Sequence, residues 1–276
     1  MRIVITGASG FLGGAAFNQL NAAGFDCIGV SRSNHPALHR VASYSDAPEG
    51  DFLIHFAETN DRSLANAGGE ALEAVAHNTL SALLAKGYRH VVYASSAVLY
   101  GDQSTTPRKV TDLVSTVDAY TRIKRRSEEI VLERGGAVVR LSNIYGPGMP
   151  AANVFNHVLN QLGSGKAIKM HTLDPVRDFL WVDDAVGALF ALIEQKVAGV
   201  FNVGSGHGIS IGELVGLVQQ AAGTGQPVMA LHMLDQPSHL VLDIAATRQC
   251  LGWSPRMLLE EGIRKLVKTK MKFRIQ

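Results

Sequence analysis

Three polar residues between positions 96 and 124 have types and spacing that suit proton transfer. Tyr120 and Lys124 stand four residues apart in "AYTRIK", and Ser96 ends the run "HVVYASS". In a helix, side chains at this spacing share a face, and a nearby ammonium favours the phenolate form of a tyrosine. Such a tyrosine is a better general acid or base, and a serine hydroxyl at a strand end can help to polarise a substrate carbonyl. The three residues predict a proton-transfer site.

A tyrosine and a lysine at this spacing, taken alone, are more often a solvated surface pair. Tyr93 and Tyr100 are rival tyrosines, but Tyr93 lies within a predicted strand and neither is followed by a lysine four residues later. Lys124 could also hold the ribose of a cofactor. The prediction of a proton-transfer site therefore depends on a cofactor site elsewhere in the chain.

A glycine-rich turn near the N-terminus predicts that cofactor site. The stretch "GASGFLG", residues 7–13, directly follows the strand-like run "RIVIT" and opens a helical pattern. Glycines allow a tight turn and a close approach to a pyrophosphate, and a helix N-terminus presents free N–H groups to the anion. The order of strand, turn and helix makes this signal much stronger than glycines alone. We expect cofactor contacts from Gly7, Ser9, Gly10, Phe11, Leu12 and Gly13.

The end of the second predicted strand, "GVSRS", bears on which dinucleotide is bound. Proteins that bind the unphosphorylated dinucleotide usually carry Asp or Glu here, which accepts hydrogen bonds from the ribose 2′-hydroxyl. This chain has Ser31 and Arg32, and a guanidinium can hold a 2′-phosphate with two charge-assisted hydrogen bonds. The alternative is that Arg32 is a solvated loop residue. The sequence favours NADP(H), with NAD(H) as the other possibility.

The pattern of apolar residues predicts the elements that position these groups. Strands are predicted at "RIVITG", "DCIGVSR", "DFLIHFA", "HVVYASS" and "AVVRLS", with "HRVASYS" as a weak third strand, and helices at residues 12–23, 70–86, 117–133 and 154–162. Strands that are apolar on both faces and alternate with helices predict an α/β fold with a doubly wound parallel (Rossmann) sheet.

After residue 147 the predicted elements become shorter and mixed. We expect residues 1–147 to form the dinucleotide-binding domain and residues 148–276 mainly to form a smaller mixed α/β lobe that binds the substrate, with residues 178–200 as a candidate return to the first domain. Asp183 and Asp184 precede an apolar helical run, so N-capping is their expected role. Trp181 and Trp253 are expected in the core.

Composition excludes several other classes of protein. The 276 residues are 46% hydrophobic and 18% charged, as in compact soluble proteins, and a net charge of +2 gives no electrostatic argument for nucleic acid. No apolar run is long enough to span a bilayer, and the first residues read as a strand, not as a secretory signal. Cys27 and Cys250 are expected to be buried and reduced in a cytoplasmic protein. The ten histidines show no spacing typical of a metal site, so none is predicted.

The order of motifs along most of the chain resembles one family, the extended short-chain dehydrogenases/reductases of the nucleotide-sugar epimerase and dehydratase group. The segments that carry the resemblance are "ITGASGFLG", "HFA", "YASSAVLYG", "YTRIK", "RLSNIYGPG", "RDFLWVDD", "FNVGSG" and "LDIAATRQCLGWSP". The resemblance implies that Tyr120 is the acid/base, that Lys124 activates it and binds the cofactor ribose, and that Ser96 orients the substrate.

The same resemblance implies roles for further residues. Phe56 and Ala57 would line the adenosine side of the cofactor, and Asn78 would support the site. Asn143 and Arg177 would contact the diphosphate of a nucleotide sugar. It also implies a homodimer formed through the predicted helices at residues 70–86 and 117–133.

Departures from the family pattern narrow the expected reaction. Dehydratases of this group carry Asp-Glu directly after the position of Ser96, whereas this chain has Ala97 and Val98, so dehydration is not expected. Glu58 stands where the family often has alanine, and the segment that often supplies a second diphosphate-binding arginine offers His239. We expect a reductase acting at C4 of a 4-keto-sugar nucleotide. The alternatives are a nucleotide-sugar 4-epimerase and, more remotely, a non-catalytic sensor of NADP(H).

Overall fold

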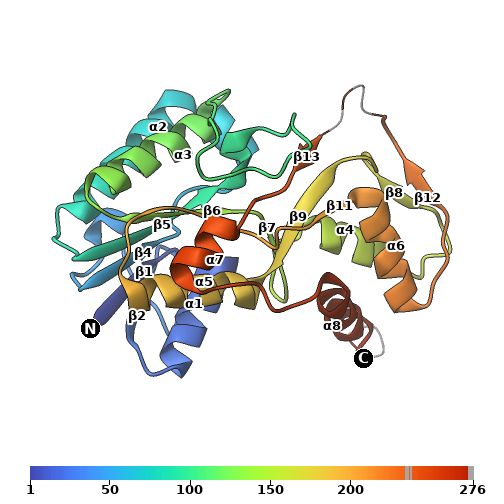
Figure 1. The fold of residues 1–276 in the computed structure, drawn as a ribbon. Coiled ribbons are helices and arrows are strands. Elements are labelled where there is room, and N and C mark those ends of the chain that lie inside the picture. Colours follow the sequence, from blue (N-terminus) through green and yellow to red (C-terminus); the bar gives the residue numbers. More distant parts are fainter. Residues whose placement is uncertain (234–235, 237, 273–276) are drawn as a thin grey trace.

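The computed structural model describes residues 1–233, 236 and 238–272. Its larger lobe is built on a seven-stranded sheet, which lies between layers of helices (Figure 1). The strand order is β10-β6-β5-β4-β1-β2-β3, and every pair is parallel. The strands are β1 (Arg2–Thr6), β2 (Asp26–Ser31), β3 (His39–Arg40), β4 (Phe52–His55), β5 (His90–Ser96), β6 (Ala137–Leu141) and β10 (Gly199–Val203). The predicted doubly wound parallel sheet is confirmed. The weak third strand is present with only two residues.

Helices cover both faces of this sheet, which explains why its strands are apolar throughout. Helices α2 (Arg62–Leu84) and α3 (Ala119–Glu133) pack together on one face, and α1 (Phe11–Ala22) and α5 (Val182–Gln195) lie on the other (Figure 1). Side chains alternate along a strand, so Ile3 and Ile5 belong to the core under α1 and α5, whereas Val4 belongs to the core under α2. Consecutive residues of a strand are therefore all buried.

The observed helices follow the predicted ranges closely, with one large difference. Helix α2 begins eight residues before the predicted range because Asp61 caps it, accepting hydrogen bonds from the backbone N–H groups of Ser63 and Leu64. The predicted range starts just after Gly69, whose φ of 50° interrupts the helix. Helix α3 is capped by Asp118, so Tyr120 lies in its first turn.

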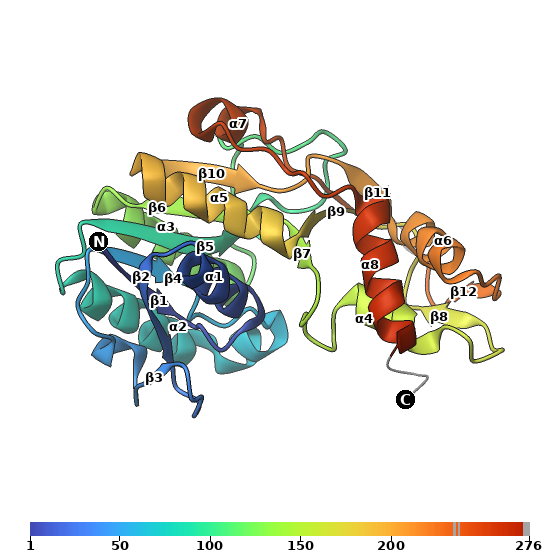
Figure 2. The same ribbon diagram turned by 90° about the horizontal axis from the view of Figure 1, so that it is seen from below.

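The smaller lobe has its own sheet and its own apolar core (Figure 2). Its mixed four-stranded sheet and a separate parallel pair come from β7 (Asn143–Tyr145), β8 (Ile168–Met170), β9 (Val176–Trp181), β11 (Gly208–Ser210), β12 (Val228–Ala230) and β13 (His239–Leu240). Its helices are α4 (Val154–Gln161), α6 (Ile211–Ala222) and α8 (Leu259–Lys272). The predicted mixed α/β lobe is confirmed.

The chain crosses back from this lobe to the large sheet. After β9 it forms α5, which contacts α1, and then β10, which pairs with β6. The short helix α7 (Ala245–Leu251) also contacts α5 and β10. The described part of the chain also contains two 3-10 helices, η1 (Tyr44–Asp46) and η2 (Ala97–Tyr100).

The predicted N-capping role of Asp183 and Asp184 is wrong, since both residues lie inside the first turn of α5. The N-cap of α5 is Trp181, which makes no capping hydrogen bond through its side chain, because β9 runs directly into the helix. Asp183 instead accepts hydrogen bonds from Gln19 Nε2 (2.6 Å) and Trp181 Nε1 (2.9 Å), and Asp184 accepts one from the backbone N–H of Met257 (2.8 Å). Their negative charges still suit the first turn of a helix.

Two other predictions about single residues have different outcomes. Trp181 and Trp253 are 4% and 7% exposed and belong to the cores, as predicted. Cys27 is half-buried, but Cys250 is exposed on α7, so the prediction of two buried thiols is wrong. In the part of the chain that the structure describes, no helix has the length and apolar character needed to cross a membrane.

Candidate active site

A cavity of about 900 Å³ opens at the carboxyl ends of β1, β4, β5 and β6. The strand order reverses direction between β1 and β4, because β2 and β3 extend the sheet on one side and β4, β5 and β6 on the other. Ligands of open α/β sheets bind at such a reversal, outside the carboxyl ends of the strands. The described residues contain no group of three or more His, Cys, Asp or Glu side chains that could hold a metal ion.

The glycine-rich turn forms one end of this cavity. Gly7 has a φ of 75°, and a Cβ there would lie 3.0 Å from the backbone carbonyl carbon of Phe56. A Cβ on Gly13 would lie 2.3 Å from the carbonyl oxygen of Gly7, so the turn tolerates no side chain at this position. Helix α1 has no side-chain cap at Gly10 and no acidic residue in its first turn. Its N–H groups therefore suit the pyrophosphate of a dinucleotide.

Of the two residues at the end of β2 that were expected to contact the cofactor, Arg32 lines the cavity and Ser31 does not. Ser31 is fully buried and does not line the cavity; its hydroxyl donates to Ser9 Oγ (2.9 Å) and accepts from the N–H of Ser33 (3.0 Å). Arg32 lines the cavity with its guanidinium 5.2 Å from the centre of the Tyr44 ring. This cation–π contact helps to orient a planar group that can bind a phosphate.

Ser96, Tyr120 and Lys124 all line the same cavity. Asp118 caps α3 by accepting from the N–H of Thr121 (2.9 Å), which sets the start of the helix and the position of Tyr120. The Lys124 Nζ lies 6.0 Å from the centre of the Tyr120 ring. Ser96 ends β5, and its hydroxyl accepts from the N–H of Val98 (3.3 Å). The three residues come from two elements that the sheet brings together.

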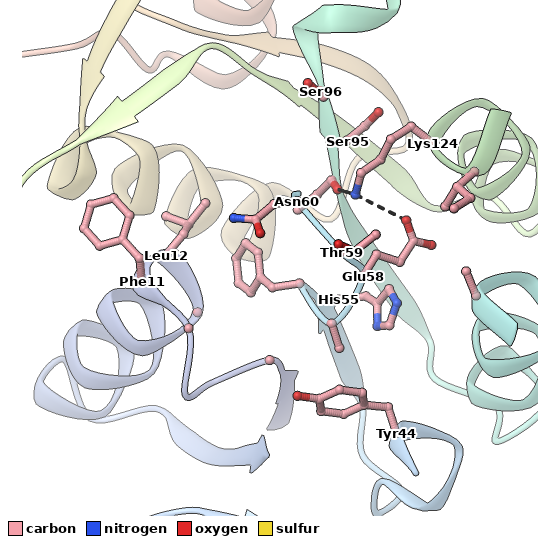
Figure 3. Close-up of a pocket in the computed structure, with 18 of the residues that line it drawn as sticks. Phe11, Leu12, Tyr44, His55, Glu58, Thr59, Asn60, Ser95, Ser96 and Lys124 are labelled. Atoms are coloured by element: carbon pink, nitrogen blue, oxygen red, sulfur yellow. Dashed lines mark hydrogen bonds and ion pairs between the residues drawn. The ribbon is translucent and has the colours of Figure 1, made fainter. Parts of the chain in front are cut away.

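Lys124 is also bound by a carboxylate that lines the cavity, Glu58 (Figure 3). The ammonium donates to Glu58 Oε2 (3.2 Å) and to the carbonyl oxygen of Ala94 (3.1 Å). Glu58 also accepts hydrogen bonds from the Tyr93 hydroxyl and from Ser127 Oγ (2.5 Å). Burial by itself would raise the pKa of Glu58, but the charge of Lys124 and these hydrogen bonds outweigh it, so the pKa lies below its usual value. The carboxyl group is therefore ionised.

His55, at the end of β4, is the buried neighbour of this pair. Its Nδ1 lies 2.7 Å from Thr6 Oγ1, and its Nε2 has no partner among the described residues. Burial lowers the pKa of His55 to about 4, with Glu58 acting in the opposite direction. The imidazole is neutral at neutral pH, so it adds no charge to the floor of the cavity.

Of the two residues expected to contact the substrate diphosphate, Asn143 lines the cavity and Arg177 does not. Asn143 lines the cavity and donates to the carbonyl oxygen of Asp178 (3.2 Å). Arg177 does not line it: Nη2 donates to Ser238 Oγ (2.6 Å) and Asp102 Oδ2 (3.4 Å), and Nη1 donates to two backbone carbonyl oxygens. The guanidinium is therefore engaged outside the cavity.

The other three positions implied by the resemblance also differ in whether they line the cavity. Phe56 and Ala57 line the cavity. Asn78 is exposed on α2 and does not line it.

Several lining residues had not been anticipated from the sequence. They are Tyr44, His55, Thr59, Asn60, Ser95, Ser142 and Asn153. Five of them, His55, Thr59, Asn60, Ser95 and Ser142, lie at or just after the carboxyl end of a strand, and that position was a usable signal. Tyr44 follows a two-residue strand, so its approach to Arg32 had no local signal.

Comparisons with known proteins find relatives along almost the whole chain. Two relatives that are 25% identical to the chain are a dTDP-6-deoxy-L-talose 4-dehydrogenase (NAD(P)(+)) from Kitasatospora kifunensis and a dTDP-4-dehydro-6-deoxyglucose reductase from Escherichia coli. The first alignment covers 96% of this chain and 94% of the relative, and the second 97% and 96%. The crystal structure of a UDP-glucose 4-epimerase from Thermotoga maritima has the same fold, with a TM-score of 0.86 and 22% identity over 100% of both chains.

A family model decides the assignment. The model described as the NAD dependent epimerase/dehydratase family matches residues 3–204, which is most of the chain. That match includes the glycine-rich turn, Ser96, Tyr120 and Lys124. The chain belongs to the NAD dependent epimerase/dehydratase family, as the resemblance to the extended short-chain dehydrogenases/reductases predicted.

Proposed function

We propose that this protein is an NADP(H)-dependent oxidoreductase that acts at C4 of a nucleotide-activated sugar, and that it reduces a 4-keto-sugar nucleotide. The observation that carries the proposal is that Ser96, Tyr120 and Lys124 line the same cavity as the glycine-rich turn. The names of the two 25% identical relatives, a 4-dehydrogenase and a reductase of deoxysugar nucleotides, support the reaction class.

The roles of the side chains follow from their chemistry. A bound nicotinamide dinucleotide supplies the hydride chemistry. The Tyr120 hydroxyl donates a proton to the C4 oxygen as the ketone becomes an alcohol, and Ser96 donates a hydrogen bond to the same oxygen. Lys124 binds the cofactor ribose and favours the tyrosinate that remains after proton transfer. The N–H groups of the turn at residues 7–13 bind the pyrophosphate.

Epimerisation at C4 is the second candidate, because it uses the same acid/base in both directions. The similar fold of a UDP-glucose 4-epimerase is compatible with it but supports the fold alone. Dehydration is not proposed, since Ala97 and Val98 in η2 place no acid or base after Ser96. A non-catalytic NADP(H) sensor would leave Ser96, Tyr120 and Lys124 without a use. The homodimer expected from the resemblance remains a prediction.

The experiment that tests the proposal is identification of any nucleotide that the purified protein retains. The protein is denatured, and the released nucleotide is identified and quantified by mass spectrometry. We expect an empty protein that binds NADPH more tightly than NADH and that reduces a 4-keto-sugar nucleotide. Near-stoichiometric NAD or NADP would favour the epimerase, which regenerates its cofactor in each cycle.

Arg32→Ala tests the preference for the phosphorylated cofactor. We expect the Kd of NADPH to rise roughly 10- to 100-fold, since each hydrogen bond between charged groups contributes about 1.5–3 kcal/mol. The Kd of NADH should change little. Both constants are measured by fluorescence titration. Arg40→Ala is the matched control, because Arg40 is exposed on the neighbouring strand and does not line the cavity. Equal losses for both cofactors would contradict a 2′-phosphate contact.

A further inference from the structure

We propose that Glu58 is a positioning residue whose buried carboxylate keeps the Lys124 ammonium charged and holds it against the carboxyl end of β5. Its catalytic consequence rests on the proposed function, because Lys124 acts there on Tyr120 and the cofactor. The state of the Lys124 side chain itself does not depend on that function.

The hydrogen bonds of Lys124 fix the direction of its ammonium group (Figure 3). An ammonium has three N–H donors. One binds Glu58 Oε2 (3.2 Å) and a second binds the carbonyl oxygen of Ala94 (3.1 Å). These acceptors come from the segment after β4 and from β5, so the ammonium is held between that segment and β5. One N–H is left for the cavity.

The carboxylate of Glu58 is held by donors from both β5 and α3. Its carboxylate accepts from the Tyr93 hydroxyl on β5 and from Ser127 Oγ on α3, in addition to Lys124. The partner residues lie 35 to 69 positions away in the sequence. A carboxylate with three donors from two elements has little freedom to swing away from the ammonium.

The burial of the pair makes the carboxylate necessary for the charge of Lys124. The side chains of Glu58 and Lys124 are 3% and 6% exposed. A buried ammonium has lost most of its hydration, and without an opposite charge beside it the neutral amine is favoured. Glu58 is the one carboxylate among the described residues that line the cavity.

The other ionisable groups around the pair cannot replace Glu58. Burial keeps His55 neutral, with a pKa of about 4. Burial and the Glu58 charge raise the pKa of Tyr93 well above its usual value, so its hydroxyl stays protonated. Tyr120, on α3, also lines the cavity, but it carries a phenol and not a carboxylate. Glu128, also on α3, forms ion pairs with Arg140 and Arg125 instead.

Glu58→Gln tests the proposal through the reactivity of Lys124. A neutral amine is acylated by acetic anhydride, whereas an ammonium is not. The full-length protein is labelled briefly over a range of pH, and the peptide that contains Lys124 is quantified by mass spectrometry. At pH 8 we expect Lys124 in the variant to be acylated roughly tenfold more than in the wild-type protein. Exposed lysines such as Lys109 serve as the internal reference.

Two further variants separate charge from packing. Ser127→Ala removes one hydrogen bond from Glu58 but no charge, and should change Lys124 labelling by less than about twofold. Glu58→Asp keeps the charge and is expected to remain within the same range. Labelling of Lys124 that is unchanged in Glu58→Gln, or that rises equally in Glu58→Asp, would overturn the proposal. If the Gln variant does not fold, a roughly tenfold rise of Lys124 labelling in Glu58→Asp would still overturn the proposal, because that variant keeps the charge.

The labelling result is independent of turnover, so the two proposals can fail separately. A wild-type protein that reduces no keto-sugar nucleotide would remove the proposed function and leave the Glu58 result standing. An active protein whose Lys124 reactivity does not respond to Glu58→Gln would remove only the positioning role.

Discussion

Tyr120→Phe is expected to lower kcat roughly 10²- to 10⁴-fold, the range that positioned general acids and bases contribute. Phenylalanine keeps the ring, which is 7% exposed and packs with Ala65 and Ile123. The change therefore removes only the hydroxyl that transfers the proton. Binding of NADPH should stay within about twofold, since the turn at residues 7–13 and Lys124 are untouched. Steady-state kinetics and fluorescence titration measure the two effects.

Tyr145→Phe is the matched control for this prediction. Tyr145 is 1% exposed in the core of the smaller lobe, and its hydroxyl has no hydrogen-bond partner among the described residues. Loss of that hydroxyl leaves no donor or acceptor unpaired, so the variant should keep both stability and activity. Full activity in Tyr120→Phe would remove Tyr120 from the reaction.

Glu128→Ala is expected to lower the free energy of unfolding by about 3–5 kcal/mol, because it leaves a buried charge without its partner. Glu128 and Arg140 are 0% and 3% exposed, and the guanidinium donates to both carboxylate oxygens, at 2.9 and 2.7 Å. The hydroxyl of Ser95 also donates to Glu128 (2.6 Å). The ion pair therefore connects α3 to β6, and the hydrogen bond from Ser95 connects α3 to β5, the strand that ends in Ser96.

The neighbouring Glu129 gives a control on the same helix. Its side chain is 37% exposed and pairs with Arg125 at 3.0 Å on the surface, where such pairs contribute less than about 1 kcal/mol. Urea denaturation of Glu128→Ala and Glu129→Ala should therefore give very different midpoints. Equal midpoints would mean that the buried pair adds no more to stability than the exposed one.

The geometry of single turns and helices could be predicted from local sequence. The glycines of residues 7–13, the alternation of apolar runs, and the spacing of Tyr120 and Lys124 each depend on residues close together in the chain, where backbone geometry is the main constraint. Errors arose where a local pattern allowed two outcomes. Asp183 looked like a cap, but β9 leads straight into α5 and places Asp183 inside the first turn.

By itself, therefore, the sequence determined the fold, the glycine-rich turn and the spacing of the residues proposed for proton transfer. Only the tertiary structure decided how the charges pair. Lys124 pairs with Glu58, 66 positions away in the sequence, and lines the cavity. Arg177 pairs with Asp102, 75 positions away, and is engaged outside the cavity. Such partners are chosen by strand order and by helix packing, and both burial and counter-charge depend on that arrangement. No spacing along the chain contains that information.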